Sequence, residues 1–362
     1  MTESFFGEQE QPSRVKSDIV VAYFAAWARI VSRRSAHVAY WDPYSGPGRY
    51  ESGDPSTPLL LLQEALRQPN LDRQLIALFS DESEAYVAQL DIEVRSLSGV
   101  ERFHRSPRVE RRSVEESFAE HRSTIEAIPT LTFLDPWGYR GLSSALINSV
   151  TEGFACDAVF FFNYNRINAA IVNELVEPRM QHVFTADRLA QLQAELQSVP
   201  VSERERMVMR ALGDAVRSGE DRYLVPFRFA FAGGRTSHYI CFVTKNPMAL
   251  GIMKDIMAKR GLTDEDGVPR FEFIPSYAGR QMGFDEERPL RRLPGALIAA
   301  FSHQTLTVQD LFLRHHPGTP FVKQNYKTVL KQMEEAGEIA CDRPRERRPK
   351  ETLADRVRVT FA

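Results

Sequence analysis

Residues 37–53 (HVAYWDPYSGPGRYESG) constrain the fold most, because an apolar strand there runs directly into a glycine-rich turn. The strand ends at Asp42, and the turn SGPG follows at residues 45–48. A buried strand that brings a carboxylate and then bare backbone to one point is typical of cofactor sites in α/β folds. Residues 130–138 (TLTFLDPWG) repeat the arrangement and deliver Asp135. The two acidic strand ends predict one pocket lined by both carboxylates.

Composition excludes several classes of protein. The 362 residues fit one large or two modest domains, and a hydrophobic content of 43% is ordinary for a soluble globular protein. No stretch approaches the roughly 18–20 apolar residues of a membrane span, and the polar start MTESFFGEQEQPSR predicts no secretory signal. The three cysteines form no CxxC pair and the eight histidines no HxxxH pair. We therefore expect no disulfide, no metal site and a cytoplasmic location.

The alternation of strands and helices predicts the fold class. After a helix expected over residues 17–31, with Ser17 as its N-cap, strands are expected near residues 37–41, 74–80, 108–114, 130–135 and 157–163. Helices are expected between them at residues 57–67, 84–97 and 144–153. This order predicts an α/β, Rossmann-like sheet that is mostly parallel with helices on both faces.

The pattern changes after the fifth strand. Residues 169–220 are helical and polar, which indicates an insertion rather than another crossover. Residues 223–244 then form two strands around a Gly-Gly turn, so the sheet is expected to end in an antiparallel hairpin. A helix is expected over residues 250–259.

The C-terminal part predicts a winged-helix module. A linker is expected at residues 288–294, and Thr307 and Thr319 are placed as N-caps, the second followed by Pro320. After a helix that ends near Gly337 come a strand, the basic loop RPRERRPK and a last strand. The chain is thus divided into a domain over residues 1–290 and a winged helix over residues 295–362.

The glycine turn does not fit a phosphate-binding motif. The GxGxxG pattern would need glycine where Glu51 stands, and no GxxxxGK[ST] loop occurs. A cofactor that carries an amine and no phosphate suits Asp42 better, because a carboxylate would repel a pyrophosphate. The alternative interpretation is an ordinary tight turn after a buried strand.

Two further strand ends carry candidate site residues. At the second strand, Asp81 or Glu82 is placed to accept hydrogen bonds from a ribose, although either could instead cap the following helix. At FLDPWG, Asp135 could hydrogen-bond a planar amine while Trp137 stacks on it, or both could be turn and core residues. Asn163, Asn165 and Arg166, after the fifth strand, could bind substrate at the carboxyl edge of the sheet, or they could be ordinary polar loop residues.

The C-terminal module carries basic residues that could contact phosphates. A solvated surface that binds protein is the alternative. Residues of the terminal helix and of the wing form this set: Lys323, Asn325, Lys327, Lys331, Arg343, Arg345, Arg347, Arg348 and Lys350. The net charge of −2 excludes a globally basic nucleic-acid coat but not such local patches.

These motifs together resemble a known family. Residues 15–260 resemble the class I S-adenosylmethionine-dependent methyltransferases, in which a parallel sheet ends in an antiparallel hairpin. The resemblance implies S-adenosylmethionine as cofactor, with Asp81 or Glu82 holding its ribose. It places the methionine part of the cofactor against the first strand end, namely Asp42, Tyr44, Ser45, Gly46, Pro47 and Gly48.

More narrowly, the chain resembles the three-Cys-motif partner family of bacteria and phages. The matching features are the K…IV..YF..W helix, DPYSGPGRY, FLDPWG, ICFVTKNP…IMKDIM and the winged-helix tail. The resemblance implies a radical-SAM-like partner encoded nearby, and the three cysteines of the name belong to that partner.

One motif departs from the pattern of amino-directed nucleic-acid methyltransferases. Their (D/N)PP(Y/F/W) motif corresponds here to Asp135, Pro136 and Trp137 followed by Gly138, so the second proline is missing. Asp135, Pro136 and Trp137 are the predicted catalytic residues. The predicted function is a methyltransferase acting on nucleic acid; the alternative is a non-catalytic partner or a DNA-binding regulator that keeps the fold.

Overall fold

The computed structural model describes residues 3–136, 138–217, 222–231, 233–274, 289–342 and 353–361, with side chains from residue 11 onward. The chain divides into two compact units. One contains Met1–Asn246 and Phe273–Ser276, and the other contains Pro247–Glu272 and Tyr277–Ala362. The second unit therefore begins at Pro247, well before the linker expected at residues 288–294.

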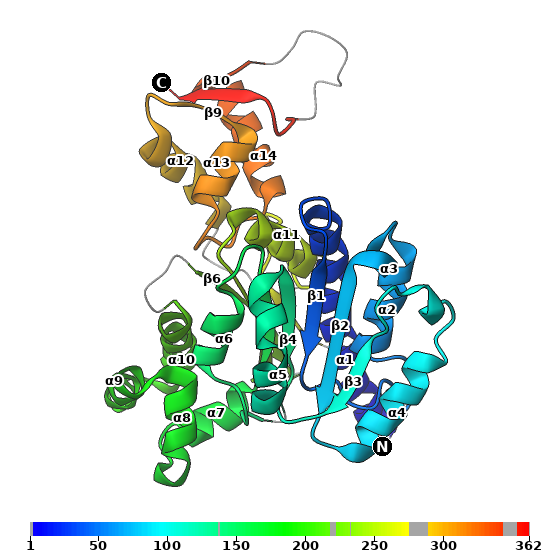
Figure 1. The fold of residues 1–362 in the computed structure, drawn as a ribbon. Helices are drawn as coiled ribbons and strands as arrows, with labels where there is room; N and C mark the ends of the chain where they lie inside the picture. The colour runs from blue at the N-terminus through cyan, green and yellow to red at the C-terminus, as the bar shows by residue number, and fades with distance from the viewer. Residues whose placement is uncertain are drawn as a thin grey trace. The chain divides into compact units, whose positions relative to one another are not determined.

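The first unit contains a mostly parallel sheet with the strand order β3-β2-β1-β4-β5-β7-β6-β8 (Figure 1). Strands β1 to β5 run parallel, while β7 is antiparallel to both β5 and β6. The predicted fold class, a Rossmann-like sheet of the class I methyltransferase type with a late hairpin, is confirmed. The strands are β1 (Val38–Asp42), β2 (Leu75–Asp81), β3 (Arg108–Arg111), β4 (Thr130–Leu134), β5 (Asp157–Phe162), β6 (Tyr223–Ala230), β7 (Thr236–Thr244) and β8 (Glu272–Phe273).

The central strands are apolar because helices cover both faces of the sheet. All five residues of β1 and of β4 are buried. Tyr40 contacts Phe24 of α1 (Glu3–Val31), whereas the next residue, Trp41, contacts Phe118 of α5 (Val114–Ala127). Since neighbouring side chains of a strand point to opposite faces, α1 and α5 lie on opposite sides of the sheet. The other helices of this part are α2 (Thr57–Arg67), α3 (Leu71–Gln74), α4 (Glu84–Arg95), η1 (Val100–Arg102) and α6 (Ser144–Val150).

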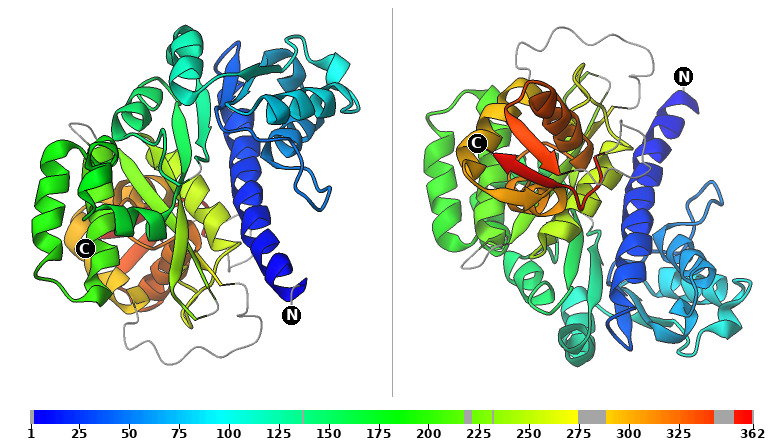
Figure 2. Two further views of the ribbon diagram at one scale, coloured as in Figure 1. Left: turned by 90° about the horizontal axis from the view of Figure 1, so that it is seen from below. Right: turned by 90° about the horizontal axis from the view of Figure 1, so that it is seen from above.

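Helix α1 is longer than expected and runs as one continuous helix from Glu3 (Figure 2). The prediction that Ser17 is its N-cap is wrong, because this residue lies in the middle of the helix. Its hydroxyl instead forms hydrogen bonds with the hydroxyls of Tyr50 (2.8 Å) and Thr57 (2.9 Å). Helix α1 is thereby fixed to the segment that follows β1.

A group of helices separates β5 from the hairpin, where the insertion was expected. Their apolar faces, which include Met180, Phe184, Leu192 and Val208, join the core on one side of the sheet. The helices are α7 (Tyr164–Ala170), η2 (Glu174–Val176), α8 (Glu177–Phe184), α9 (Ala186–Leu196) and α10 (Val201–Val216).

The second unit contains a winged helix. Its three-stranded antiparallel sheet has the order β10-β11-β9. Thr307 caps α13 as predicted, accepting a hydrogen bond from the Asp310 amide (3.0 Å), and Gly337 adopts a φ of 76° after α14. The elements are α11 (Pro247–Ala258), η3 (Pro289–Arg292), α12 (Leu293–Phe301), β9 (Thr305–Thr307), α13 (Val308–His315), α14 (Lys323–Glu335), β10 (Ile339–Asp342) and β11 (Arg358–Phe361).

Two predictions about this unit are wrong. Residues 289–294, expected as a linker, belong to η3 and the start of α12. Helix α14 begins at Lys323 with Val322 as its N-cap, and not after Thr319. The hydroxyl of Thr319 donates instead to the His316 carbonyl (2.9 Å), so it stabilises the preceding turn.

Candidate functional site

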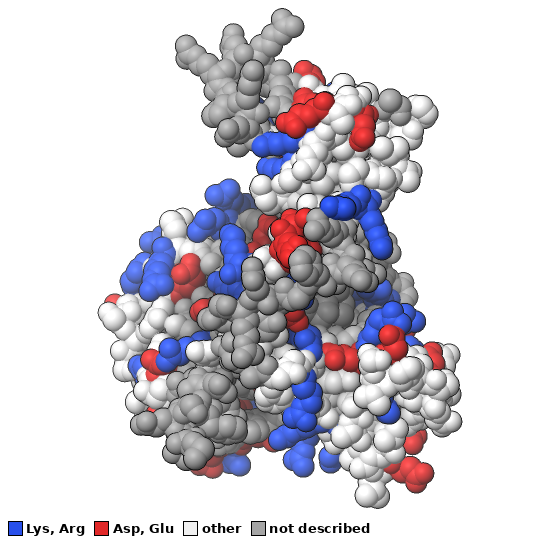
Figure 3. All heavy atoms as spheres, turned by 180° about the vertical axis from the view of Figure 1, so that it is seen from behind, with Lys and Arg blue, Asp and Glu red and all other residues white. Residues whose placement is uncertain are grey.

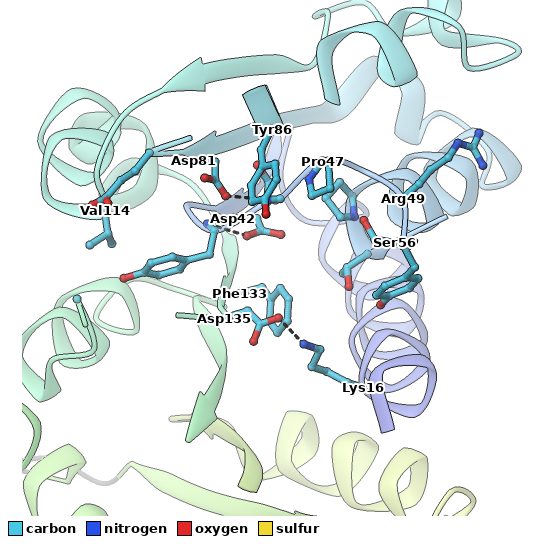
Figure 4. Close-up of a pocket in the computed structure, with 18 of the residues that line it drawn as sticks. Lys16, Asp42, Pro47, Arg49, Ser56, Asp81, Tyr86, Val114, Phe133 and Asp135 are labelled. Atoms are coloured by element: carbon cyan, nitrogen blue, oxygen red, sulfur yellow. Dashed lines mark hydrogen bonds and ion pairs between the residues drawn. The ribbon is translucent and has the colours of Figure 1, made fainter. Parts of the chain in front are cut away.

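Three carboxylates meet at the carboxyl edge of the sheet (Figure 4). Asp42 and Asp81 end β1 and β2, and Asp135 directly follows β4. Because β2, β1 and β4 are parallel neighbours, their ends lie side by side around one cavity of about 510 Å³. The cavity is lined by Lys16, Asp42, Tyr44, Ser45, Gly46, Pro47, Arg49, Tyr50, Ser56, Thr57, Pro58, Asp81, Glu82, Tyr86, Val114, Glu115, Phe133, Asp135, Arg140 and Gly141.

Asp42 is the most deeply buried of the three acids. Its side chain accepts a hydrogen bond from the Tyr44 amide (3.1 Å), and the residue is only 1% exposed. Burial raises the pKa of Asp42 well above its ordinary value; the Tyr44 amide lowers it, and the charges of Asp135 and Asp81 raise it further. A cation placed in the cavity would favour the ionised form of this carboxylate.

Asp81 fixes the glycine turn to the end of β2. One carboxylate oxygen accepts from the Gly46 amide (3.1 Å) and the other from the Ser83 amide (2.8 Å). The N-cap of α4 is Ser83, so neither Asp81 nor Glu82 caps that helix. Both acids line the cavity, and the side chain of Glu82 is exposed.

The two glycines of the turn differ in surroundings. Gly46 has a φ of +62° and lines the cavity, and a Cβ added to it would meet no atom within 4 Å. Gly48 has a φ of +88°, and a Cβ there would lie 2.8 Å from Leu90 Cδ1. Gly48 is not among the residues that line the cavity; its small size instead lets the turn pack against α4.

Asp135 forms an ion pair with Lys16 of α1. The Lys16 ammonium also lies 5.5 Å from the centroid of the Phe161 ring. Burial lowers the pKa of Lys16, but the charge of Asp135 and the hydrogen bond to it outweigh burial, so the pKa is raised. Pro136 is buried, and Trp137 lies outside the described residues.

Sequence reasoning missed several residues of the cavity, notably Lys16, Arg49, Tyr86 and Arg140. With the first helix expected to start at Ser17, Lys16 would lie just outside it. Because α1 begins at Glu3, Lys16 lies within the helix, and its side chain reaches Asp135. The long first helix is the signal that would have found it.

The predicted nucleic-acid residues of α14 are largely engaged within the second unit. Lys323 and Lys327 both pair with Asp355 (2.9 and 2.7 Å). Asn325 is 4% exposed, donates to the Gly267 carbonyl (3.0 Å) and accepts from the Val322 amide (3.0 Å). Its side chain is therefore structural, and the prediction that it contacts nucleic acid is corrected.

The remaining basic residues of this module divide into two groups. Lys331 forms no ion pair with any residue that the structure describes. The wing residues lie outside the described part of the chain: Arg343, Arg345, Arg347, Arg348 and Lys350.

Metal sites and membrane spans are both absent from the described part of the chain. Among the described residues, no group of three or more His, Cys, Asp or Glu side chains is placed to hold a metal ion. None of the helices in the described ranges is long and apolar enough to cross a membrane.

A sequence-family comparison identifies the C-terminal module. Residues 272–346 match the family described as GMT-like wHTH domain, where wHTH denotes a winged helix-turn-helix. The matched residues include α12, α13, α14, β9 and β10 of the second unit and end before β11. No curated protein matches the sequence.

Solved structures that are similar to part of this chain include several methyltransferases. The methyltransferase domain of a bacterial Hen1 protein (CtHen1-C) is 8% identical, with a TM-score of 0.33 over 63% of this chain and 97% of that one. Precorrin-6y C5,15-methyltransferase from Geobacter metallireducens is 11% identical, with a TM-score of 0.29 over 62% and 87%. The plantazolicin methyltransferase BpumL, crystallised with SAH, is 10% identical, with a TM-score of 0.30 over 66% and 88%. At these TM-scores the similarity carries no argument, so the fold assignment rests on strand order and direction.

Proposed function

We propose that the first unit binds S-adenosylmethionine and that the protein is a methyltransferase acting on nucleic acid. The observation that carries this proposal is the convergence of Asp42, Asp81 and Asp135 on one cavity beside the glycine turn. A volume of about 510 Å³ is within the range of small-molecule sites. The sheet order and the antiparallel hairpin support the same assignment.

The chemistry of the cavity fits this cofactor. S-adenosylmethionine carries an ammonium and a sulfonium and no phosphate, which suits a cavity lined by several carboxylates. Asp42, whose pKa is raised by burial, would be stabilised in its ionised form by the cationic methionine part. Asp81 or Glu82 would accept from the ribose hydroxyls, and the apolar side chains of Val114 and Phe133 offer surface for the adenine ring.

The residues of the chain would mainly align the reactants. When bound, the cofactor supplies an activated methyl group, and its transfer needs little acid–base assistance beyond orientation. Asp135 would orient or deprotonate the nucleophile of the target, and Trp137, which follows Pro136 in the sequence, would stack on a base of the target. Lys16 would hold the carboxylate of Asp135 in position.

The decisive experiment is calorimetric titration with S-adenosylmethionine. The wild type should bind, and Asp42→Asn should bind at least tenfold more weakly, because the amide keeps the acceptor for the Tyr44 amide but loses the charge. The thermal melting curve of the variant should remain cooperative. If the wild type binds no cofactor at millimolar concentration, the enzyme proposal fails.

The nucleic-acid target and the partner are further parts of the proposal. The winged helix supports a role in contacting nucleic acid, with Lys323, Lys327 and Lys331 facing phosphates. The resemblance to the three-Cys-motif partner family supports a radical-SAM-like protein as partner. Transfer of labelled methyl groups to DNA, RNA and protein pools, with and without the neighbouring gene product, tests both parts.

Asp355 offers a sharper test of the winged helix. Its carboxylate forms ion pairs with both Lys323 and Lys327, and these lysines lower the pKa of Asp355 against the effect of burial. Asp355→Asn should free both lysines and strengthen duplex DNA binding severalfold at low salt. Asp342→Asn makes the same charge change at an exposed position and should have little effect. Equal behaviour of the two variants would contradict the role of α14.

A second candidate is a non-catalytic partner or DNA-binding regulator that keeps the fold. The ion pair between Lys16 and Asp135 favours it, because the carboxylate that would receive a target amine is already engaged. This candidate predicts cofactor-independent nucleic-acid binding and no methyl transfer to any pool.

A further inference from the structure

Three exposed arginines surround a second cavity in the first unit. Arg140 belongs to the segment after β4, Arg166 to α7 and Arg179 to α8. The cavity has a volume of about 400 Å³ and is lined by Gly138, Tyr139, Arg140, Arg166, Ala169, Ala170, Asn173, Val176 and Arg179. We call Arg140, Arg166 and Arg179 the arginine cluster.

The arginine cluster lacks acidic partners among the described residues. No carboxylate lines this cavity, and none of the three guanidinium groups forms an ion pair with a described residue. Several other arginines of the unit are paired, for example Arg49 with Glu93 (2.7 Å) and Arg122 with Glu126 (2.8 Å). Like charges gathered around one concave surface repel each other, and an anion bound there would relieve that repulsion.

The chemistry of the cavity favours phosphate as this anion. Arginine presents a planar set of donors that matches phosphate oxygens in a bidentate manner. Arg166 lies over the loop backbone, since a Cβ on Gly138 would be 3.2 Å from its Nη1. Tyr139 adds an aromatic ring and Asn173 an amide to the same lining, both suited to a nucleotide.

The arginine cluster adjoins the proposed cofactor cavity. Arg140 lines both cavities, and with Gly141 it also lines a third cavity of about 210 Å³. Glu115 is the only carboxylate among the described residues that line this third cavity. A polymer whose backbone lay on the arginine cluster would therefore have a neighbouring group beside the cavity that Asp135 lines.

We propose that the arginine cluster binds the phosphodiester backbone of a single-stranded nucleic-acid substrate and presents one of its bases to the cofactor cavity. The inference rests on the proposed function and names the surface that holds the target. A single strand is favoured because a base must leave the helical stack before it can enter a recessed site. The contact is made by the first unit, separately from any contact made by the winged helix.

The test is binding of a fluorescent single-stranded oligonucleotide to the full chain at several salt concentrations. Arg166→Ala/Arg179→Ala should weaken binding at least tenfold. It should also reduce the slope of log K against log salt by about 1.4, because each phosphate contact to a single strand contributes about 0.7. Arg140 is left unchanged because it also lines the proposed cofactor cavity.

The matched control is Arg33→Ala/Arg34→Ala. Both arginines are exposed and lie just before β1 at the opposite edge of the sheet, and the control removes the same charge. It should retain wild-type affinity and salt slope. Calorimetry with S-adenosylmethionine on the same proteins reports separately on the proposed function, and the Arg166→Ala/Arg179→Ala variant should bind the cofactor as the wild type does.

Three outcomes overturn the inference. The first is equal weakening by both double variants, and the second is an unchanged affinity in Arg166→Ala/Arg179→Ala. The third is binding of poly-glutamate that depends on Arg166 and Arg179 while oligonucleotide binding does not. In each case, cofactor binding by the wild type would leave the proposed function standing.

Discussion

Lys16 and Asp135 form the ion pair on which the geometry of the candidate site most depends. Their side chains are 15% and 24% exposed, so each charge is largely removed from water and relies on the other. The pair connects α1 to the end of β4, and it determines how far the Asp135 carboxylate can reach into the cavity. Removing one partner leaves the other charge unpaired, so it should lower the stability of the first unit more than removing both partners does.

We expect Lys16→Met and Asp135→Asn each to destabilise the first unit by about 2 kcal/mol, less than the roughly 3–5 kcal/mol of a fully buried pair because both side chains are partly exposed. The double variant should lose clearly less than the sum. Denaturant unfolding followed by tryptophan fluorescence measures the coupling. The pair Arg14 and Asp54, at 57% and 47% exposure, is the control and should show nearly none. Additive losses at Lys16 and Asp135 would contradict this view.

Gly141 should tolerate substitution worse than Gly46. Both have positive φ angles, of +73° and +62°, so each alanine variant carries about 1–2 kcal/mol of backbone strain. At Gly141 a Cβ would also lie 2.1 Å from the Tyr44 hydroxyl and 2.7 Å from Val114 Cγ1, whereas at Gly46 it would meet nothing within 4 Å. Overpacking should add about 1–3 kcal/mol at Gly141. Equal midpoints of denaturant unfolding for the two alanine variants would contradict the structure.

The meeting of Asp42, Asp81 and Asp135 at one cavity could be predicted because each carboxylate stands at the end of an apolar strand. The role of Lys16 could not be predicted, because its partner Asp135 lies 119 positions away in the sequence and the ion pair depends on how α1 crosses the sheet. The packing of Gly48 against α4 could not be predicted either, because a glycine in such a turn can serve contact with a ligand or contact with a helix.

At the scale of elements, α11 carries an unusual buried charge. Lys254 is 2% exposed, and its ammonium donates to the carbonyls of His316 (3.2 Å) and Thr319 (2.9 Å). Burial lowers the pKa of Lys254 to about 7, while Asp255 on the same helix raises it. His315, His316 and Lys323 also face this region. Burial lowers the pKa of both histidines, and the charge of Lys254 lowers it further.

Lys254 should make the stability of the second unit depend on pH. Its pKa is about 7 in the folded chain against 10.5 ordinarily, so the unfolded chain binds more protons between these values. Stability should therefore rise from pH 7 towards pH 10.5, and the contribution to the slope should vanish below pH 7. Calorimetric melting of the full chain at pH 7 and 9 should show the rise in the wild type and not in Lys254→Met.

Lys259→Met is the control for this prediction. Lys259 is exposed on the segment just after α11, so its loss should leave the pH dependence unchanged. If Lys254→Met and the wild type showed the same change in melting between pH 7 and 9, another group would be responsible.

Elements were predicted well wherever burial produced a continuous apolar run. The strands ending at Asp42 and Leu134 are examples, since both faces of each are covered. Helix starts were predicted poorly. Ser17 and Thr319 are residue types that commonly cap helices, but their hydroxyls form other hydrogen bonds here. The proline and arginines of residues 288–294 suggested a linker, yet Leu293 and Leu297 are fully buried in the winged-helix core.

At the scale of the whole molecule, charge is mixed rather than uniformly basic. The face in Figure 3 shows Lys and Arg interspersed with Asp and Glu, in keeping with the net charge of −2. Nucleic-acid binding must therefore depend on local groups of cations. The division of the chain at Pro247 could not be predicted, because α11 reads as one more crossover helix. The arginine cluster was equally hidden, since it joins three segments that are separated in the sequence.

Cofactor binding should protect the first unit alone. Every residue that lines the proposed cofactor cavity belongs to Met1–Asn246. With S-adenosylmethionine at about one hundred times its dissociation constant, mass action stabilises the binding unit by about 2.7 kcal/mol. Hydrogen exchange should slow at the turns after β1, β2 and β4 and remain unchanged in α13 and α14. Protection centred on the winged helix would contradict the placement of the cofactor.

The hydrogen bond from the Tyr44 hydroxyl to the Arg140 carbonyl (3.2 Å) offers a route by which cofactor and target could affect each other's binding. It connects the turn after β1 to the loop that walls both cavities. If binding of one ligand shifted that turn, the shift would act on the loop that lines the other cavity. By thermodynamic reciprocity, the factor by which cofactor changes the affinity for target must equal the factor by which target changes the affinity for cofactor. A tenfold coupling corresponds to about 1.4 kcal/mol and would raise the affinity for each ligand tenfold once the other is bound.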